Sequence, residues 1–237
     1  VQGKRITTFV LKYPKFILAE FNTHRTFSRS TASSRAIPTA KILEMVKSDP
    51  VIPVYWGKNQ PGMQAEEELD SCGQFDSKNV WLKARDKAVE QVEELVKLGL
   101  HKQTASRLLE PFLYVSTICT ATEWGNFYNL RCDKAAQPEM RCLAEKMLEV
   151  HNQSTPEKLG DGQWHLPFLT KEDYKLTYFN LEKGFFQKVS AARCARVSYL
   201  NHDGTNPDMN KDIILAEKLL GSGHLSPFEH QAKPAVI

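Results

Sequence analysis

The sequence predicts an α+β fold in a single domain, and three observations support this. Apolar residues recur at helical spacing along most of the 237 residues, and two short runs, residues 4–11 and 112–122, are rich in β-branched and aromatic side chains. In addition, no internal repeat, low-complexity tract or linker divides the chain. We therefore expect residues 1–237 to form one domain, with helices around a mixed or antiparallel sheet.

The first part of the chain gives strand, helix and loop signals in turn. Residues 4–11, KRITTFVL, predict a strand, and residues 13–25, YPKFILAEFNTHR, predict a helix that starts at a proline. The stretch 21–38 then covers the end of this helix and the loop after it. Three prolines between residues 50 and 75 predict a long connection that holds at most one short helix.

Most of the later elements are expected to be helices. One helix is predicted from the capping residues Asp76 and Ser77 to Gly99, with Trp81, Ala84, Ala88, Val92 and Leu95 on one face. A short helix ending at Pro111 precedes the second strand, residues 112–122. Further helices are expected at 123–130, 137–151, 181–199 and 209–221.

Composition and charge exclude several classes of protein. The chain is 41% hydrophobic and 25% charged, as globular proteins are, and its net charge of +3 is small for a protein that binds duplex nucleic acid. Its five cysteines form no CxxC pair, so neither a disulfide framework nor a zinc site is predicted. No apolar run approaches a membrane helix and no signal-peptide pattern is present. We expect a soluble cytoplasmic protein that binds acidic small molecules and not membranes or nucleic acid.

The stretch 21–38, FNTHRTFSRSTASSRAIP, combines hydroxyl groups and arginines and contains no carboxylate. Its Ser33-Ser34-Arg35 run could hold a phosphate through hydroxyls, backbone N–H groups and a guanidinium, although a serine-rich turn is an equal alternative. Arg107 and Arg131 lie in apolar surroundings and suit recognition of an anion, the alternative being ordinary surface ion pairs. We expect the charge of this stretch to be left for a ligand.

The C-terminal stretch GSGHLSPFEH places His224, Ser226, Glu229 and His230 close together. Their spacing matches no zinc pattern, so capping of a helix start is the better interpretation. The sequence also contains no nucleophilic serine elbow, phosphate P-loop or GxGxxG turn.

Three stretches together resemble the flavin-dependent thymidylate synthases. Residues 23–35, THRTFSRSTASSR, are similar to the family signature Arg-His-Arg, seven residues, Ser-x-Arg, except at its first position. Residues 126–141 resemble the family's asparagine and arginine segment that leads into an Ala-Gln-x-Glu helix. Residues 191–230 resemble the segment with which those enzymes begin. Because this segment closes the present chain, the resemblance implies a circular permutation.

The resemblance implies that the chain methylates C5 of a uracil nucleotide, converting dUMP to dTMP. Arg131 would be the catalytic residue, which holds the N3 and O4 edge of uracil and stabilises negative charge as C5 becomes nucleophilic. The other implied substrate-binding residues are Glu20, where the family has a nucleotide-contacting glutamine, and Ser33, Ser34, Arg35 and Arg107.

The same resemblance implies the cofactors and the assembly. Methylenetetrahydrofolate would supply the carbon, reduced FAD the hydride, and NADPH the electrons that recharge the flavin. The active sites would be shared between the subunits of a homotetramer. The positions that match flavin contacts are Thr23, His24, Arg25, Thr31, Asn126, Ser198, His224 and Ser226.

Departures from the family pattern leave alternatives open. Thr23 replaces an arginine, Thr31 replaces an acid, and Thr120 replaces an asparagine that would touch the flavin. Two threonine hydroxyls near the sugar could favour UMP over dUMP, and loss of hydride delivery would give a hydroxymethylated pyrimidine nucleotide. A non-catalytic nucleotide-binding or RNA-binding homologue is a further alternative, with bases stacked on exposed Trp124, Phe127 and Tyr128.

Overall fold

A computed structural model of the chain describes residues 3–175, 182–197 and 208–234. Its sheet has three antiparallel strands in the order β1-β3-β2, formed by Thr7–Pro14, Tyr114–Ala121 and Ser28–Thr31. The central strand, β3, is largely buried, as its β-branched composition predicts. β1 and β3 confirm the two predicted strands. β2 corrects the prediction of a loop at 21–38, because its four residues have no alternating pattern and form a strand only by pairing with β3.

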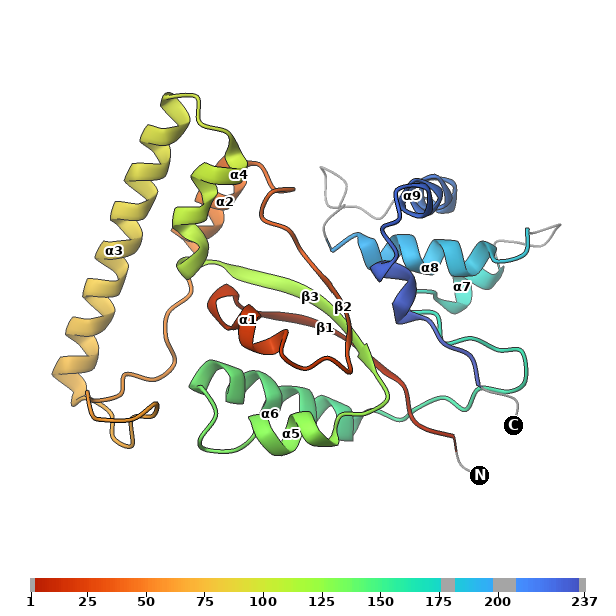
Figure 1. Cartoon of the computed structure of the whole chain (residues 1–237), viewed down its shortest axis with the longest axis horizontal. Helices are drawn as coiled ribbons and strands as arrows, with labels where there is room; N and C mark the ends of the chain where they lie inside the picture. The colour runs from red at the N-terminus through yellow and green to blue at the C-terminus, as the bar shows by residue number, and fades with distance from the viewer. Residues whose placement is uncertain (1–2, 176–181, 198–207, 235–237) are drawn as a thin grey trace.

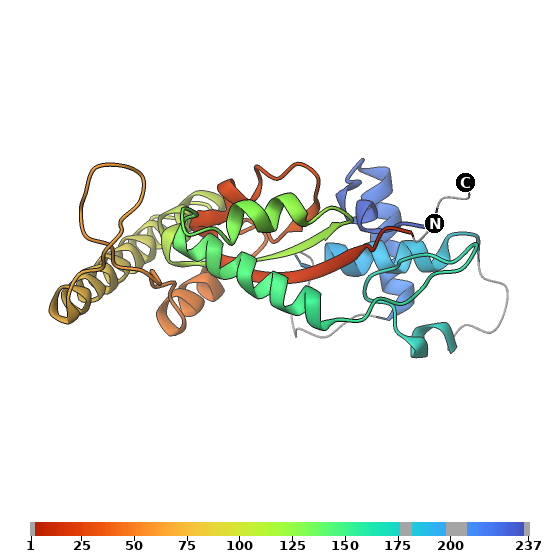
Figure 2. The same cartoon turned by 90° about the horizontal axis from the view of Figure 1, so that it is seen from below.

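One face of the sheet carries the larger hydrophobic core. The 3₁₀ helix η1 (Lys15–Ile17), α1 (Leu18–Phe21), α5 (Gly125–Arg131) and α6 (Pro138–Gln153) contribute to this core, and α6 runs alongside β1 (Figure 2). The predicted helices at 123–130 and 137–151 are therefore confirmed. Phe127 and Trp124 are 1% and 5% exposed, so they offer no platform for stacked bases. This burial counts against the RNA-binding alternative.

A second core lies at one end of the sheet, on the left of Figure 1, between α2 (Thr39–Ser48), α3 (Ser71–Lys97), α4 (Lys102–Ala105) and the 3₁₀ helix η2 (Ser106–Phe112). α2 was not predicted. α3 starts five residues before the predicted Asp76, because Asp70 accepts a hydrogen bond from the Gly73 N–H (2.8 Å) and caps the helix. The end of α3 is as predicted, since Gly99 has a φ of 80°. Ala84, on the predicted apolar face, is exposed.

The C-terminal part of the chain packs at the other end of the sheet, on the right of Figure 1. It contains α7 (Lys171–Lys175), α8 (Phe185–Ala195), α9 (Met209–Gly221) and the 3₁₀ helix η3 (Ser226–His230). The fully buried carboxylate of Asp212, on α9, pairs with Arg193 at 3.2 Å and Arg196 at 2.8 Å, which joins α9 to α8. α8 and α9 confirm the helices expected at 181–199 and 209–221 within the described residues.

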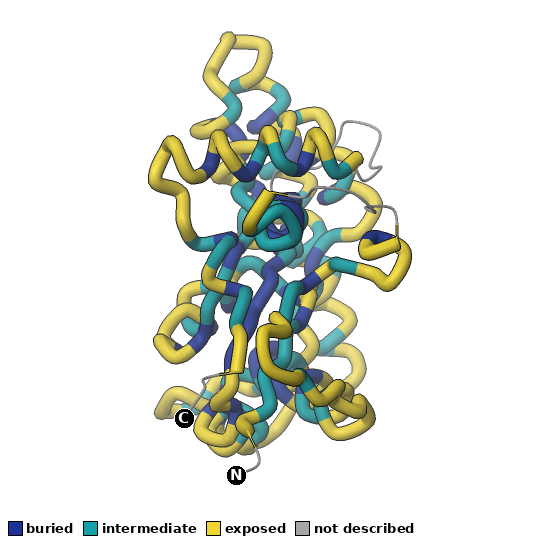
Figure 3. Tube along the Cα trace, turned by 90° about the vertical axis from the view of Figure 1, so that its right-hand side faces the viewer, coloured by how far each residue is buried: buried dark blue, intermediate teal, exposed yellow. Residues whose placement is uncertain are grey.

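A buried chain of hydroxyl and imidazole groups joins η3 to the sheet. His230 bonds to Ser30 through Nε2 (3.0 Å) and to Thr120 through Nδ1 (2.8 Å). Thr120 bonds to Thr8 (2.8 Å), which bonds to His165 (2.8 Å). Burial lowers the pKa of His230 to about 4, with the nearby His165 as a smaller cause. Buried residues are concentrated along the strands (Figure 3). The predicted capping of a helix start by Ser226 and Glu229 is wrong, because the N-cap of η3 is Leu225 and no side chain caps this helix. His230 belongs to the hydrogen-bond network instead.

Two further predictions from the sequence concern membrane-spanning helices and the cysteines. No helix in the described ranges combines the length and apolar character needed to cross a membrane. Among the cysteines, Cys119 and Cys194 are buried, and burial raises the thiol pKa of Cys194 to about 12. Cys72 and Cys142 are exposed. The described residues hold no cluster of His, Cys, Asp and Glu that could bind a metal ion.

Candidate active site

Arg131, the last residue of α5, reaches the loop after α1 and contacts three residues there. Its Nε donates to Nε2 of His24 (2.9 Å), its Nη1 donates to the Glu20 carboxylate, and its Nη2 lies 3.4 Å from the Thr23 hydroxyl. A guanidinium has five N–H groups. The two that are left, one on each Nη, have no partner among the described residues. Because the Arg131 side chain is 20% exposed, this edge remains available to a ligand.

His24 is enclosed by aromatic rings. Phe27 stacks on it at 5.7 Å between ring centroids, and Phe127 meets it edge-on at 4.9 Å. Burial lowers the pKa of His24, and the positive charges of Arg131 and Arg29 lower it further. The ring is therefore neutral near pH 7, and its Nε2 accepts from Arg131 while Nδ1 carries the proton. This geometry makes His24 a support for Arg131.

Arg29 holds the loop that presents these side chains, a role that sequence reasoning missed. Its Nη1 donates to the backbone carbonyls of His24 (2.6 Å) and Asn22 (3.2 Å). In the sequence, Arg29 looks like its neighbours Arg25 and Arg35. Only its pairing opposite Cys119 in the sheet directs it inward, and no local pattern signals that pairing.

A cavity of about 990 Å³ opens beside Arg131 and Glu20. Its walls come from η1 and α1, the connection between α2 and α3, α3 itself and the start of α6. Phe16, Tyr55 and Trp81 supply aromatic surface. An open cavity of this size, lined by aromatic side chains and by charged donors that include Arg131, suits a planar polar ligand.

A second charged cluster lies on η1, η2 and the loop after β2. The Glu110 carboxylate accepts from Lys15 (2.6 Å), Arg107 (2.7 Å) and the Ser34 hydroxyl (3.3 Å). Burial alone would raise the pKa of Glu110, but the hydrogen bonds from Lys15 and Arg107 outweigh burial and lower it. Glu110 and Glu20 thus pair with Lys15, Arg107 and Arg131, which lie outside the 21–38 stretch. Among the described residues no carboxylate pairs with the arginines of the stretch itself, so the expectation that its charge is left for a ligand stays a prediction.

The structure distributes the other predicted residues over separate places. Thr31, on β2, bonds to the Thr117 hydroxyl at 3.0 Å. Arg25, Arg35 and Asn126 are exposed. Ser33 lies partly buried in the loop after β2, and Ser198 lies outside the described residues.

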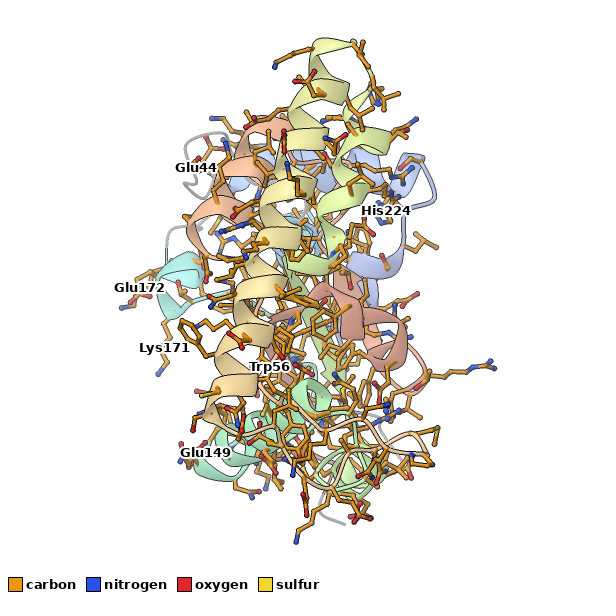
Figure 4. All side chains as sticks on the ribbon, turned by 90° about the vertical axis from the view of Figure 1, so that its left-hand side faces the viewer. Glu44, Trp56, Glu149, Lys171, Glu172 and His224 are labelled. Carbon is orange, nitrogen blue, oxygen red and sulfur yellow. The ribbon has the colours of Figure 1, made fainter. Side chains whose placement is uncertain are left out.

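His224 and Ser226 belong to the C-terminal segment. Figure 4 shows His224 well away from Trp56, whose neighbours Tyr55 and Gly57 line the cavity. None of the predicted flavin positions in the described part of the chain lines the cavity beside Arg131.

Comparison with known proteins decides the family. A sequence model of the thymidylate synthase complementing proteins matches residues 5–157, more than half of the chain. The chain belongs to this family. The match includes Glu20, the signature at 23–35, Arg107 and Arg131, and it ends before the C-terminal segment.

Solved structures and curated sequences were also compared. A UMP/dUMP methylase, PolB from Streptomyces cacaoi, bound with 5-Br UMP, is 19% identical, with a TM-score of 0.49 over 62% of this chain and 68% of that chain. The same protein bound with 5-Br dUMP is 20% identical, with a TM-score of 0.47 over 62% and 65% of the two chains. No curated protein sequence matches the chain. Family membership identifies a thymidylate synthase-like methyltransferase of the type that uses FAD and a folate carbon donor.

Proposed function

We propose that the chain methylates C5 of dUMP to give dTMP, with methylenetetrahydrofolate as carbon donor, reduced FAD as hydride source and NADPH as reductant. The observation that carries this proposal is the guanidinium of Arg131, held by Glu20 and His24 with a free edge facing a cavity in a chain of this family. Donors that are already oriented cost no reorganisation when charge develops on the base. When bound, the flavin supplies the hydride.

Within the chain, different residues would bind the base and the phosphate. Arg131 donates to a carbonyl of the base and stabilises the negative charge that develops on it as C5 attacks the carbon donor. Ser33, Ser34, Arg35 and Arg107 hold the phosphate. To reach the phosphate, Arg107 would either leave its ion pair with Glu110 or contact Glu110 and the phosphate at the same time.

Copies of the chain would complete the site. The predicted flavin positions that the structure describes come from the loop after α1, from β2, from α5 and from the C-terminal segment, and exposed Arg25 and Asn126 are free to face a neighbouring copy. We propose that residues 1–237 act as one domain within a homotetramer whose subunits share each site. Thr23, His24, Arg25, Thr31, Asn126, Ser198, His224 and Ser226 would then contribute to the flavin environment.

The proposed circular permutation is supported by the position of the C-terminal motif. His230 of SPFEH lies on β2 and β3, and Ala232 pairs with His165 in an isolated bridge next to the same network. In the family order this motif would lead directly into the strand that corresponds to β1. Under the proposed permutation, this contact with the sheet would be kept although the order of the motifs differs.

The ribonucleotide alternative loses the observation that favoured it. The Thr31 hydroxyl bonds to Thr117, and the Thr23 hydroxyl donates to the Glu20 carbonyl at 2.7 Å. Both hydroxyls already have partners within the chain, so neither needs a ribose 2′-OH to satisfy it, although each keeps an acceptor lone pair. We propose dUMP as the substrate, and the comparison of dUMP with UMP tests this choice.

The test is product mass. Purified protein with FAD and NADPH is incubated with dUMP or UMP, with and without methylenetetrahydrofolate. We expect folate-dependent dTMP from dUMP, and a large loss of kcat/KM in Arg131→Lys at unchanged thermal stability. A methylated product from UMP alone would move the assignment to the ribonucleotide, and a hydroxymethylated product would show loss of hydride delivery. Unmodified nucleotide in every reaction would refute the proposal.

A further inference from the structure

We propose that Glu20 is a specificity-determining residue that selects uracil and rejects cytosine by facing the N3 position of the base. This inference rests on the proposed function and names how its site chooses a substrate. It concerns the carboxylate that stands where the family has a glutamine.

The geometry places an acceptor next to a donor at the cavity wall. Glu20 Oε1 accepts from Nη1 of Arg131, and its Oε2 has no partner among the described residues. The Glu20 side chain is 28% exposed, and both residues line the cavity. A ligand in the cavity thus meets a free guanidinium edge and, beside it, a free carboxylate oxygen.

This pair is complementary to a carbonyl with an adjacent N–H. Uracil offers that edge, because N3–H lies between two carbonyls, either of which can accept from Arg131. Cytosine carries a lone pair at N3, which would face the negative Glu20 oxygen. The mismatch at N3 is present whether Arg131 meets position 2 or position 4 of the ring. At position 4 the amino group of cytosine would, in addition, face the donor edge of Arg131.

A carboxylate discriminates between uracil and cytosine more strictly than a carboxamide does. An ionised carboxylate can only accept hydrogen bonds, whereas a glutamine amide can turn and donate to a lone pair. Glu20 also pairs with Arg131, so the two side chains together present one donor edge and one acceptor edge to the base.

The experiment is equilibrium binding by titration calorimetry, with saturating FAD, of dUMP, dCMP and N3-methyl-dUMP. Unaltered protein should bind dUMP at least about tenfold more tightly than either other nucleotide, as expected for a hydrogen bond to a charged group. Glu20→Gln should narrow the preference for dUMP over dCMP at least about tenfold, because its amide can donate to N3. Glu66→Gln is the matched control: Glu66 lines the same cavity and has no contact with Arg131 among the described residues, so the preference should stay unchanged.

The outcomes separate the two proposals. If the unaltered protein methylates dUMP but Glu20→Gln leaves the preference unchanged, the inference about Glu20 is overturned and the proposed function stands. If the unaltered protein binds dUMP and N3-methyl-dUMP equally well, N3–H is not read and the inference is again overturned. If it neither binds nor methylates a uracil nucleotide, both proposals are wrong.

Discussion

Acid should destabilise the fold through His230, which joins the C-terminal segment to the sheet. Its ring is fully buried, both nitrogens are hydrogen-bonded to hydroxyls, and burial lowers its pKa from 6.5 to about 4. The unfolded chain therefore binds a proton below about pH 6.5, whereas the folded protein does not until about pH 4. The stability that neutral His230 contributes is present above pH 6.5 and is lost as the pH falls from there to about 4.

The size of this effect follows from the difference in pKa. A difference of 2.5 units, from 6.5 to about 4, corresponds to about 3 kcal/mol at roughly 1.4 kcal/mol per unit. Because the ring is fully buried, solvent screening reduces this figure little. For comparison, each hydrogen bond to Ser30 or Thr120 contributes about 1 kcal/mol.

The assay is urea unfolding of the unaltered protein and of His230→Gln between about pH 7 and pH 4.5. Near pH 7 the variant should be less stable by about 1–3 kcal/mol, the cost of disturbing the two hydrogen bonds. Because glutamine does not titrate, the variant should lack most of the loss of about 3 kcal/mol in unfolding free energy that acid causes in the unaltered protein. Plotted against pH, the unfolding free energies of the two proteins should therefore converge or cross. A difference that stays constant within about 0.5 kcal/mol over this range would refute the reasoning.

Three other substitutions test contacts elsewhere in the chain. Only neutral His24 can accept a hydrogen bond from Arg131, and the pKa of His24 lies below 6.5, so kcat/KM for dUMP should fall at acid pH as His24 is protonated. His24→Gln should not show this decrease at acid pH. The same decrease in both proteins would contradict the role of His24 in orienting Arg131. Asp212→Asn removes the fully buried carboxylate that contacts Arg193, which keeps its ion pair with Asp173, and the buried Arg196, and it should cost about 3–5 kcal/mol in urea unfolding. A loss below about 1 kcal/mol would argue against the network. Leu109→Ala, at a fully buried position of the second core, should cost about 2–5 kcal/mol, whereas its neighbour Leu108, 47% exposed, should tolerate alanine within about 0.5 kcal/mol.

Sequence reasoning could name residues of the candidate site that lie within one short motif, but it could not name the contacts between distant segments. Arg131 was identified from sequence because it lies in a short motif next to an aromatic helix. The partners that orient it could not be identified by position alone, since Glu20 is 111 residues away. Likewise, Lys15 pairs with Glu110, which lies 95 residues further along the chain. Local composition reports what a segment contains and not what folds against it.

The sequence by itself determined the elements whose signal is local. The central strand is a run of β-branched residues, and the end of α3 follows from a glycine that adopts a positive φ. The family signature likewise occupies a few neighbouring positions. These features depend on residues that are close together along the chain.

Only the tertiary structure decided which polar groups are buried and paired. Ser28–Thr31 is a strand because β3 offers it unpaired backbone groups, and His230 is buried because Ser30, 200 residues away, meets it across the sheet. The physical reason is that a buried polar group requires a partner, and long-range packing alone selects that partner. The same packing sets Glu20 beside Arg131, and so it decided the chemistry that the candidate site can offer.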